Sequence, residues 1–199
     1  MQHVTRRWWL MASFGAPFTL GLSASALRVR LDGDDLRVAA PEFRFLTGKP
    51  LERLKDGDSV AYLASLELLD ESKTTPLRTA RGRFVVSYAL WEEQFSVTQL
   101  AAKPVTRNGL SAVGAEAWCF ENLPLDTSGV SADRYLWLRF EIHTANARDV
   151  AAEGIPGVSF ARIIQWLGRK NTEQTQWGPL ERRVRLADLP RTPGRGSRG

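Results

Sequence analysis

The stretch Arg134-Tyr-Leu-Trp-Leu-Arg-Phe-Glu-Ile-His-Thr144 decides the fold class of this chain, because apolar and polar side chains alternate along it without a break. Successive side chains of an extended strand point to opposite faces of a sheet. One face would carry Leu136, Leu138, Phe140 and Ile142, and the opposite face Tyr135, Trp137, Arg139, Glu141 and His143. The pattern therefore predicts a β-strand with one face in a hydrophobic core.

The same period of two recurs before this stretch. Residues 27–31 and 36–40 alternate on either side of Asp32-Gly-Asp-Asp35, which predicts a β-hairpin. A second tight turn at Asp56-Gly-Asp58 precedes an alternating strand over residues 59–70. Residues 83–90 and 95–99 also alternate, separated by Trp91-Glu-Glu-Gln94, and the sequence leaves open a hairpin or one long bent strand.

Two segments have helical spacing instead. Apolar residues from Leu110 to Trp118 recur every three or four positions after Asn108-Gly109, and Ser159 would cap a helix that ends at Gly168. Residues 41–55 are expected to be a connector, because Gly48 and Pro50 interrupt regular structure. Many short strands with one or two short helices indicate a mainly β fold, a single antiparallel β-sandwich.

The chain divides into three parts. Residues 1–26 combine two arginines, a short apolar stretch and small residues around Ala24 and Ala26, which is the layout of a signal peptide. Arg6-Arg7 before Trp8-Trp9 also approximates the twin-arginine pattern, so either export route fits. Residues 27–168 form the predicted sandwich, and residues 169–199 a basic, disordered tail. We expect an exported protein, periplasmic or secreted.

Most of the excess positive charge of the chain lies in the tail. The chain has a net charge of +5, and residues 169–199 alone contain eight basic and three acidic residues. The sandwich is therefore close to neutral, which argues against nucleic acid as a partner. The arginines of the tail would either touch anionic lipid at its surface or simply solubilise a disordered end; they are Arg182, Arg183, Arg185, Arg191, Arg195 and Arg198.

Familiar catalytic patterns are missing. Residues 27–199 contain one histidine, no nucleophile elbow, no phosphate-binding loop and no cysteine pair. Cys119 stands between aromatic residues and beside acidic ones, which indicates a buried apolar residue rather than a reactive thiol. We therefore expect no catalytic residues and a non-enzymatic role.

Two groups of residues are candidate binding sites. The face formed by Tyr135, Trp137, Arg139, Glu141 and His143 has the composition of an interface hot spot, although it would also suit packing under a helix or loop. The acidic turns would bind calcium if they converged, although Asp-Gly is also ordinary turn chemistry; these residues are Asp32, Asp34, Asp35, Asp56 and Asp58. No other cofactor is expected.

One segment resembles a known group of proteins. The sequence Ser87-Tyr-Ala-Leu-Trp-Glu-Glu93 within residues 83–98, followed by Ala115-Glu-Ala-Trp-Cys-Phe120, is similar to uncharacterised exported bacterial proteins with a domain of unknown function. The resemblance covers residues 27–168. It implies an envelope location and a β-rich fold, and it assigns no catalytic residue.

Three functions follow from these observations. The first is an envelope protein that binds a partner protein or a surface polymer without catalysis. The second is a hydrolase of envelope carbohydrate or peptide that acts through carboxylates such as Glu92 and Glu93, which an extended strand would point to opposite faces. The third is a structural subunit of an envelope assembly, extended through a strand edge at residues 27–31.

Overall fold

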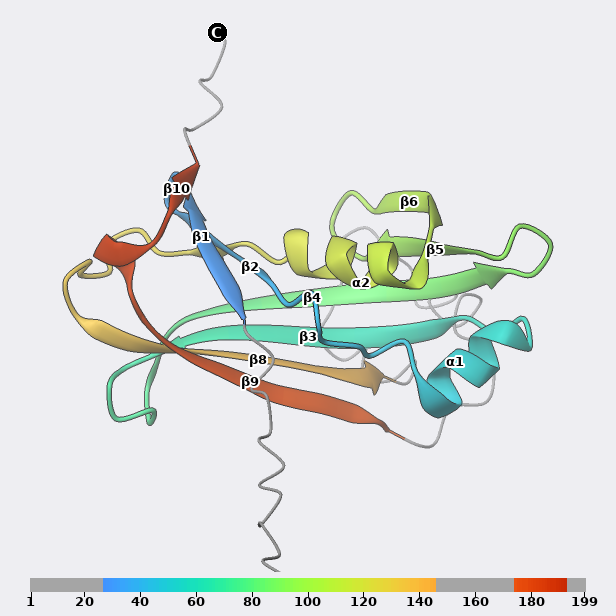
Figure 1. The fold of residues 1–199 in the computed structure, drawn as a ribbon, viewed down its shortest axis with the longest axis horizontal. Coiled ribbons are helices and arrows are strands. Elements are labelled where there is room, and N and C mark those ends of the chain that lie inside the picture. Colours follow the sequence, from blue (N-terminus) through green and yellow to red (C-terminus); the bar gives the residue numbers. More distant parts are fainter. Residues whose placement is uncertain (1–26, 146–173, 193–199) are drawn as a thin grey trace, which may run out of the picture.

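The computed structural model describes residues 27–145 and 174–192, which form two packed sheets (Figure 1). The larger sheet has the strand order β6-β5-β4-β3-β8-β9, and all its neighbours are antiparallel. Its strands are β3 (Val60–Leu69), β4 (Pro76–Ala89), β5 (Gln94–Gln99), β6 (Val105–Leu110), β8 (Tyr135–Ala145) and β9 (Gln176–Arg185). The predicted mainly β fold with two sheets is confirmed.

The smaller sheet lies across one face of the larger one. It has the order β10-β1-β2-β7, and only the β1–β10 pair is parallel. Its strands are β1 (Arg28–Asp32), β2 (Asp35–Ala39), β7 (Leu125–Asp126) and β10 (Arg191–Thr192). The predicted hairpin over residues 27–40 is therefore present as β1 and β2.

The core lies between the two sheets and follows the period of two. Leu66 of β3 stands opposite Phe140 of β8 and Ala80 of β4, and all three point into the core. Tyr62, Phe84 and Phe140 are among the largest fully buried side chains. The other face of the larger sheet, turned away from β1 and β2, is called the outer face below.

Two helices cover the ends of the core. The predicted helix is present as α2 (Ala112–Glu121), although it begins two residues after Leu110, which ends β6. The side chain of Ser111 caps it by accepting a hydrogen bond of 3.1 Å from the Gly114 amide. α1 (Gly48–Lys55) corrects the connector expected at residues 41–55. Pro50 lies in its first turn, where the missing N–H has no intrahelical partner to lose, so the proline does not break the helix.

The segment around Trp91 is a hairpin turn. Ala89 pairs with Gln94, so β4 and β5 are two strands joined by residues 90–93 rather than one bent strand. Figure 1 shows this turn projecting beyond the rest of the larger sheet, at the right of the view. The alternative that the sequence left open is thereby resolved.

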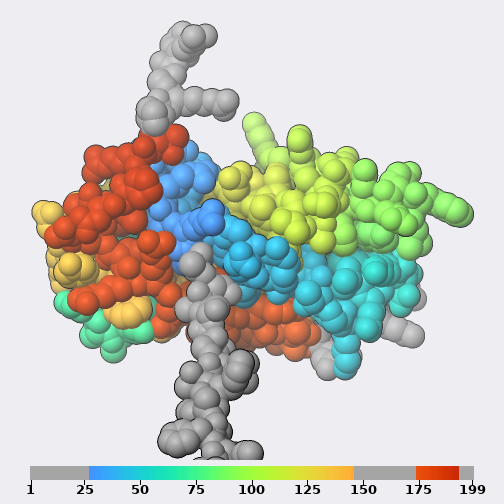
Figure 2. Space-filling view, viewed as in Figure 1, coloured from blue at the N-terminus to red at the C-terminus, as the bar shows by residue number. Residues whose placement is uncertain are grey.

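The structure corrects the expectation of a disordered tail over residues 174–192. Residues 176–185 form β9, and a single 3₁₀ turn, η1 (Leu186–Asp188), leads into β10. Val184, Leu186 and Leu189 are buried in the core, and Figure 2 shows this segment packed beside β1. Pro179 is compatible with a strand because β9 is an edge strand with an irregular register opposite residues 140–142.

Several expectations concern residues outside the described ranges. The signal peptide at residues 1–26, the helix from Ser159 to Gly168, and the last arginines, Arg195 and Arg198, all belong to this group. Among the described residues, no helix has the length and apolar character needed to cross a membrane.

Candidate functional site

The outer face carries the polar side of the strand from which the fold was predicted. Trp137, Arg139, Glu141 and His143 of β8 point to this face and are partly exposed, as expected. The register of the sheet places β3 beside them, with Glu67 opposite Arg139, Ser65 opposite Glu141 and Leu63 opposite His143. These residues form the middle of a partly exposed surface made from three strands.

At one end of the outer face, cations stack on both predicted aromatic residues. The Lys73 Nζ atom lies 3.6 Å from the ring centroid of Trp137. Two guanidinium groups approach the ring of Tyr135, that of Arg183 at 4.2 Å and that of Arg185 at 5.7 Å. Cation–π contacts of this kind help to hold the rings in place, while Tyr135 remains 47 % exposed.

An ion-pair network joins this end of the face to β9. Glu181 accepts from Lys73 Nζ at 2.5 Å and from Arg139 Nε at 3.0 Å. The hydrogen bond from Lys73, helped by the one from Arg139, lowers the pKa of the Glu181 carboxyl below its usual range. Arg183 pairs in turn with Glu71 at 2.6 Å. The charged groups of this end are therefore paired and positioned by the fold, with one cation in excess.

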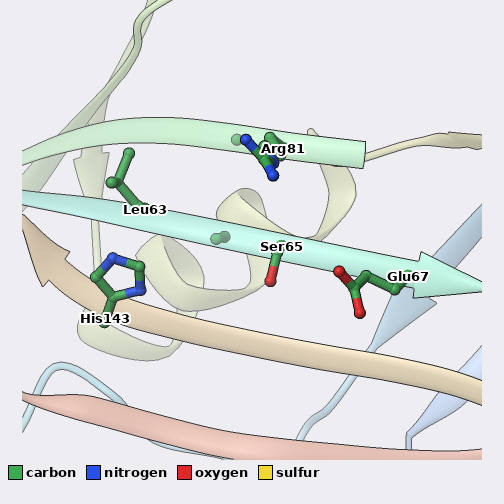
Figure 3. Close-up of a pocket in the computed structure, with 7 residues that line it drawn as sticks. Leu63, Ser65, Glu67, Arg81 and His143 are labelled. Atoms are coloured by element: carbon green, nitrogen blue, oxygen red, sulfur yellow. The ribbon is translucent and has the colours of Figure 1, made fainter. Parts of the chain in front are cut away.

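Between His143 and Glu67, the outer face contains a small hollow (Figure 3). Its volume is about 230 Å³, and its lining includes Leu63, Ser65, Glu67, Arg81 and His143 from β3, β4 and β8. Figure 3 shows the side chains of these five residues on the same side of the sheet. Pockets for cofactors and drug-sized ligands measure about 300–1,000 Å³, so the hollow has room for one side chain or a group of similar size.

The serine and the histidine of the hollow are not joined as a catalytic pair. Within the described ranges, no hydrogen bond joins the Ser65 hydroxyl to the His143 imidazole, and Glu141 accepts only a long contact of 3.5 Å from Gln176. Glu92 and Glu93 lie in the exposed β4–β5 turn, away from the hollow. Among the described residues, Glu92 and Glu93 therefore do not combine with the polar residues of the hollow into one site.

The acidic turns lie in different parts of the fold. Asp32 and Asp35 flank the β1–β2 turn, where Asp32 accepts from Arg37 at 3.1 Å, whereas Asp58 follows α1 and contacts Arg53 at 3.4 Å. Figure 1 shows these two turns at opposite ends of the molecule. Within residues 27–145 and 174–192, no three acidic, histidine or cysteine side chains come together as metal ligands. The two acidic turns of the candidate calcium site therefore do not converge.

α2 contains a buried carboxylate, Glu116, whose burial the sequence does not predict. Glu116 is almost fully buried, and its Oε1 accepts from the backbone amides of Phe45 at 2.7 Å and Leu46 at 2.9 Å. Its Oε2 has no hydrogen-bond partner among the described residues and lies 3.6 Å from Arg44 Nε. Burial raises the pKa of this carboxyl. Glu116 thus connects α2 to the segment between β2 and α1.

Cys119 lies one helical turn after Glu116 and is a buried free cysteine, as expected from its neighbours. Burial raises the pKa of its thiol far above the usual range, so the reactive thiolate does not form at neutral pH.

The tail arginines are largely engaged within the fold. Arg182 donates to the Leu27 carbonyl, Arg183 pairs with Glu71, and Arg185 pairs with Asp188 at 2.6 Å. A lipid-binding role for these three would compete with those contacts.

The alternating pattern of the sequence predicts β8 but not which residues lie beside it on the outer face. Ser65 and Glu67 were detectable, because they occupy the polar positions of an alternating strand. Lys73, Arg81 and Glu181 were not, because their places depend on which strands pair and in what register. Comparison with protein-family models, curated proteins and solved structures gives no match for this chain.

Proposed function

We propose that this protein is a non-enzymatic binding protein of the cell envelope, and that its outer face binds a partner protein. The observation that supports this most directly is the arrangement of His143, Ser65 and Arg81 around a hollow of side-chain size, beside a row of positioned aromatic and charged residues. Tyr, Trp and Arg dominate binding energy at protein interfaces, because they combine large contact area with a polar group.

The cation stacked on Trp137 favours a protein over a polysaccharide as the partner. Carbohydrates bind by stacking on exposed aromatic faces, whereas the partly buried ring of Trp137 already carries Lys73 at 3.6 Å. The partly exposed ion pairs are also held in place before binding, so little side-chain entropy is lost when a partner binds. Both features suit contact with another folded or extended polypeptide.

The proposal is tested with two matched tryptophan substitutions on the outer face. Ser65→Trp fills the hollow, while Ser96→Trp places the same side chain on the outer face of β5, outside the hollow. Both positions are partly exposed, so both variants should fold with unchanged circular dichroism.

Immobilised full-chain protein is then used to capture partners from an envelope extract of its natural host. We expect one stoichiometric protein partner with the wild type and with Ser96→Trp, and at least tenfold less with Ser65→Trp. Replacement of both Trp137 and Arg139 by Ala should have a similar effect. Equal recovery with all variants would contradict the assignment of this face.

A further inference from the structure

The turn between β4 and β5 ends in an apolar side chain that the fold does not use. Trp91 is 96 % exposed and Leu90 beside it is 55 % exposed. Turn tips usually carry Gly, Asn, Asp or Pro, because these residues adopt turn conformations at little cost. Here Glu93 adopts a positive φ of 53° in their place. Neither packing nor turn chemistry accounts for a tryptophan at this tip.

The charge around Trp91 indicates what it would contact. Glu92 and Glu93 are exposed and directly follow it, so the tip is an apolar knob with an acidic rim. An anionic lipid surface would repel this rim. A matching surface is an apolar hollow with a basic rim.

Such a hollow lies at the opposite end of β4. It has a volume of about 270 Å³ and an apolar lining that includes Leu77, Val130 and Leu136. Its charged lining residues are Arg78 and Arg134, and no acidic residue lines it. By size and by charge, this hollow is complementary to the Trp91 tip.

The two surfaces cannot meet within one molecule. Arg78 lies near the start of β4 and Trp91 just after its end, so the extended strand separates them by about 40 Å at 3.3 Å per residue. Figure 1 shows β4 running across the whole length of the sheet. The tip of one copy is therefore available only to the hollow of another.

We propose that the protein self-associates head to tail, with Trp91 of one copy in the hollow between Arg78 and Arg134 of the next. Glu92 and Glu93 then face these arginines. The two contact surfaces differ, so the association is heterologous and continues into a chain or a ring. It is independent of the outer face and its partner.

The contact is expected to be weak in dilute solution. A buried tryptophan contributes about 150–250 Å², which is far below the roughly 800 Å² per partner of a stable interface. Association should therefore require high concentration or many copies held close together.

Sedimentation velocity of the full chain, from micromolar to millimolar concentration, tests the proposal. The wild type should form species larger than monomers as its concentration rises. Trp91→Ala and Arg134→Glu should each stay monomeric, while Val113→Ala, which removes an exposed apolar residue on α2, should associate like the wild type. Both Trp91 and Arg134 are exposed, so these variants should retain the wild-type circular dichroism.

Mixing the two monomeric variants gives the decisive result. Trp91→Ala keeps an intact hollow and Arg134→Glu keeps an intact tip, so the mixture should form a one-to-one dimer that does not grow further. A wild type that stays monomeric up to millimolar concentration would overturn the proposal. So would association that persists in Trp91→Ala, or a mixture that contains only monomers.

Discussion

Removal of the buried Glu116 carboxylate should destabilise the protein more than any other single change to a charged residue of α2. Glu116→Ala leaves the amides of Phe45 and Leu46 without an acceptor, and both residues are buried. An unsatisfied buried N–H costs about 1–3 kcal/mol, so two cost about 2–6 kcal/mol. Relief of the buried charge offsets part of this, which leaves an expected loss of about 2–4 kcal/mol.

Glu116→Gln separates the hydrogen bonds from the charge. Glutamine keeps one carbonyl oxygen for the two amides, so we expect a free energy of unfolding within about 1 kcal/mol of the wild type at neutral pH. Because burial raises the pKa of Glu116 in the folded state, its protonated form stabilises the wild type below the unfolded pKa, about 4.3. This stability is lost as pH rises through the folded pKa. The free energy of unfolding of Glu116→Gln should therefore rise relative to that of the wild type as pH increases.

Urea unfolding followed by circular dichroism at pH 4.5 and pH 7 measures both effects. Glu121→Ala is the control, since Glu121 lies on the same helix but is exposed and makes only a 3.5 Å pair with Arg30. Its loss should cost less than about 1 kcal/mol. A Glu116→Ala variant that unfolds within roughly 0.5 kcal/mol of this control would contradict a role for the buried hydrogen bonds, since that difference is about the resolution of such comparisons.

Three further outcomes follow from the packing and the ion pairs. Gly82→Ala should cost about 1–3 kcal/mol by thermal unfolding, because the new Cβ would lie 2.6 Å from the Phe84 ring and 3.0 Å from Leu123; an unchanged melting temperature would contradict the close packing. Trp177→Ala should cost about 2–3 kcal/mol in urea unfolding, because its ring lies 6.0 Å from that of Tyr62 and 6.3 Å from that of Phe45; no loss would mean that β9 is not part of the fold. Glu181→Gln should cost less than about 1 kcal/mol at low salt and nearly nothing at high salt, since the group is partly exposed; a salt-independent loss would rule out an ion-pair origin.

The sequence predicted strands wherever one face was apolar and the other polar. β1, β2, β3 and β8 all have this pattern, because each has one face in the core. β9 does not have this pattern, because Gly178 and Pro179 interrupt its apolar positions. Its register against β8 also shifts between Phe140 and Ile142. The arginines of β9 give it the composition of a solvated tail, although Arg182 and Arg183 bind within the fold.

The helices differ in how plainly their ends are marked. Ser111 is a recognisable N-cap, and α2 was predicted near its observed start. In α1, Gly48 and Pro50 look like breakers, and only the burial of Pro50 and Leu54 against the core makes the segment helical. Tertiary packing of this kind leaves no local signal in the sequence.

Only the residues that β8 contributes to the candidate site are predictable from the sequence. The alternation of β8 placed Trp137, Arg139 and His143 on one face, and the structure confirms that they share it. The hollow beside His143 depends on Ser65 and Arg81, which lie about 80 and 60 residues away in the chain and join His143 only through strand pairing. Neither the composition nor the spacing of the sequence predicts how β3 pairs with β4 and β8.

Photo-crosslinking in the natural host can show directly whether the outer face of the larger sheet binds a partner protein. The photoreactive residue p-benzoylphenylalanine replaces Glu141, which lies on the outer face beside the hollow without lining it, and, as control, Val113 on α2. We expect one discrete protein adduct from position 141 and none from position 113. No adduct at position 141, or the same adduct from both positions, would rule out binding by this face.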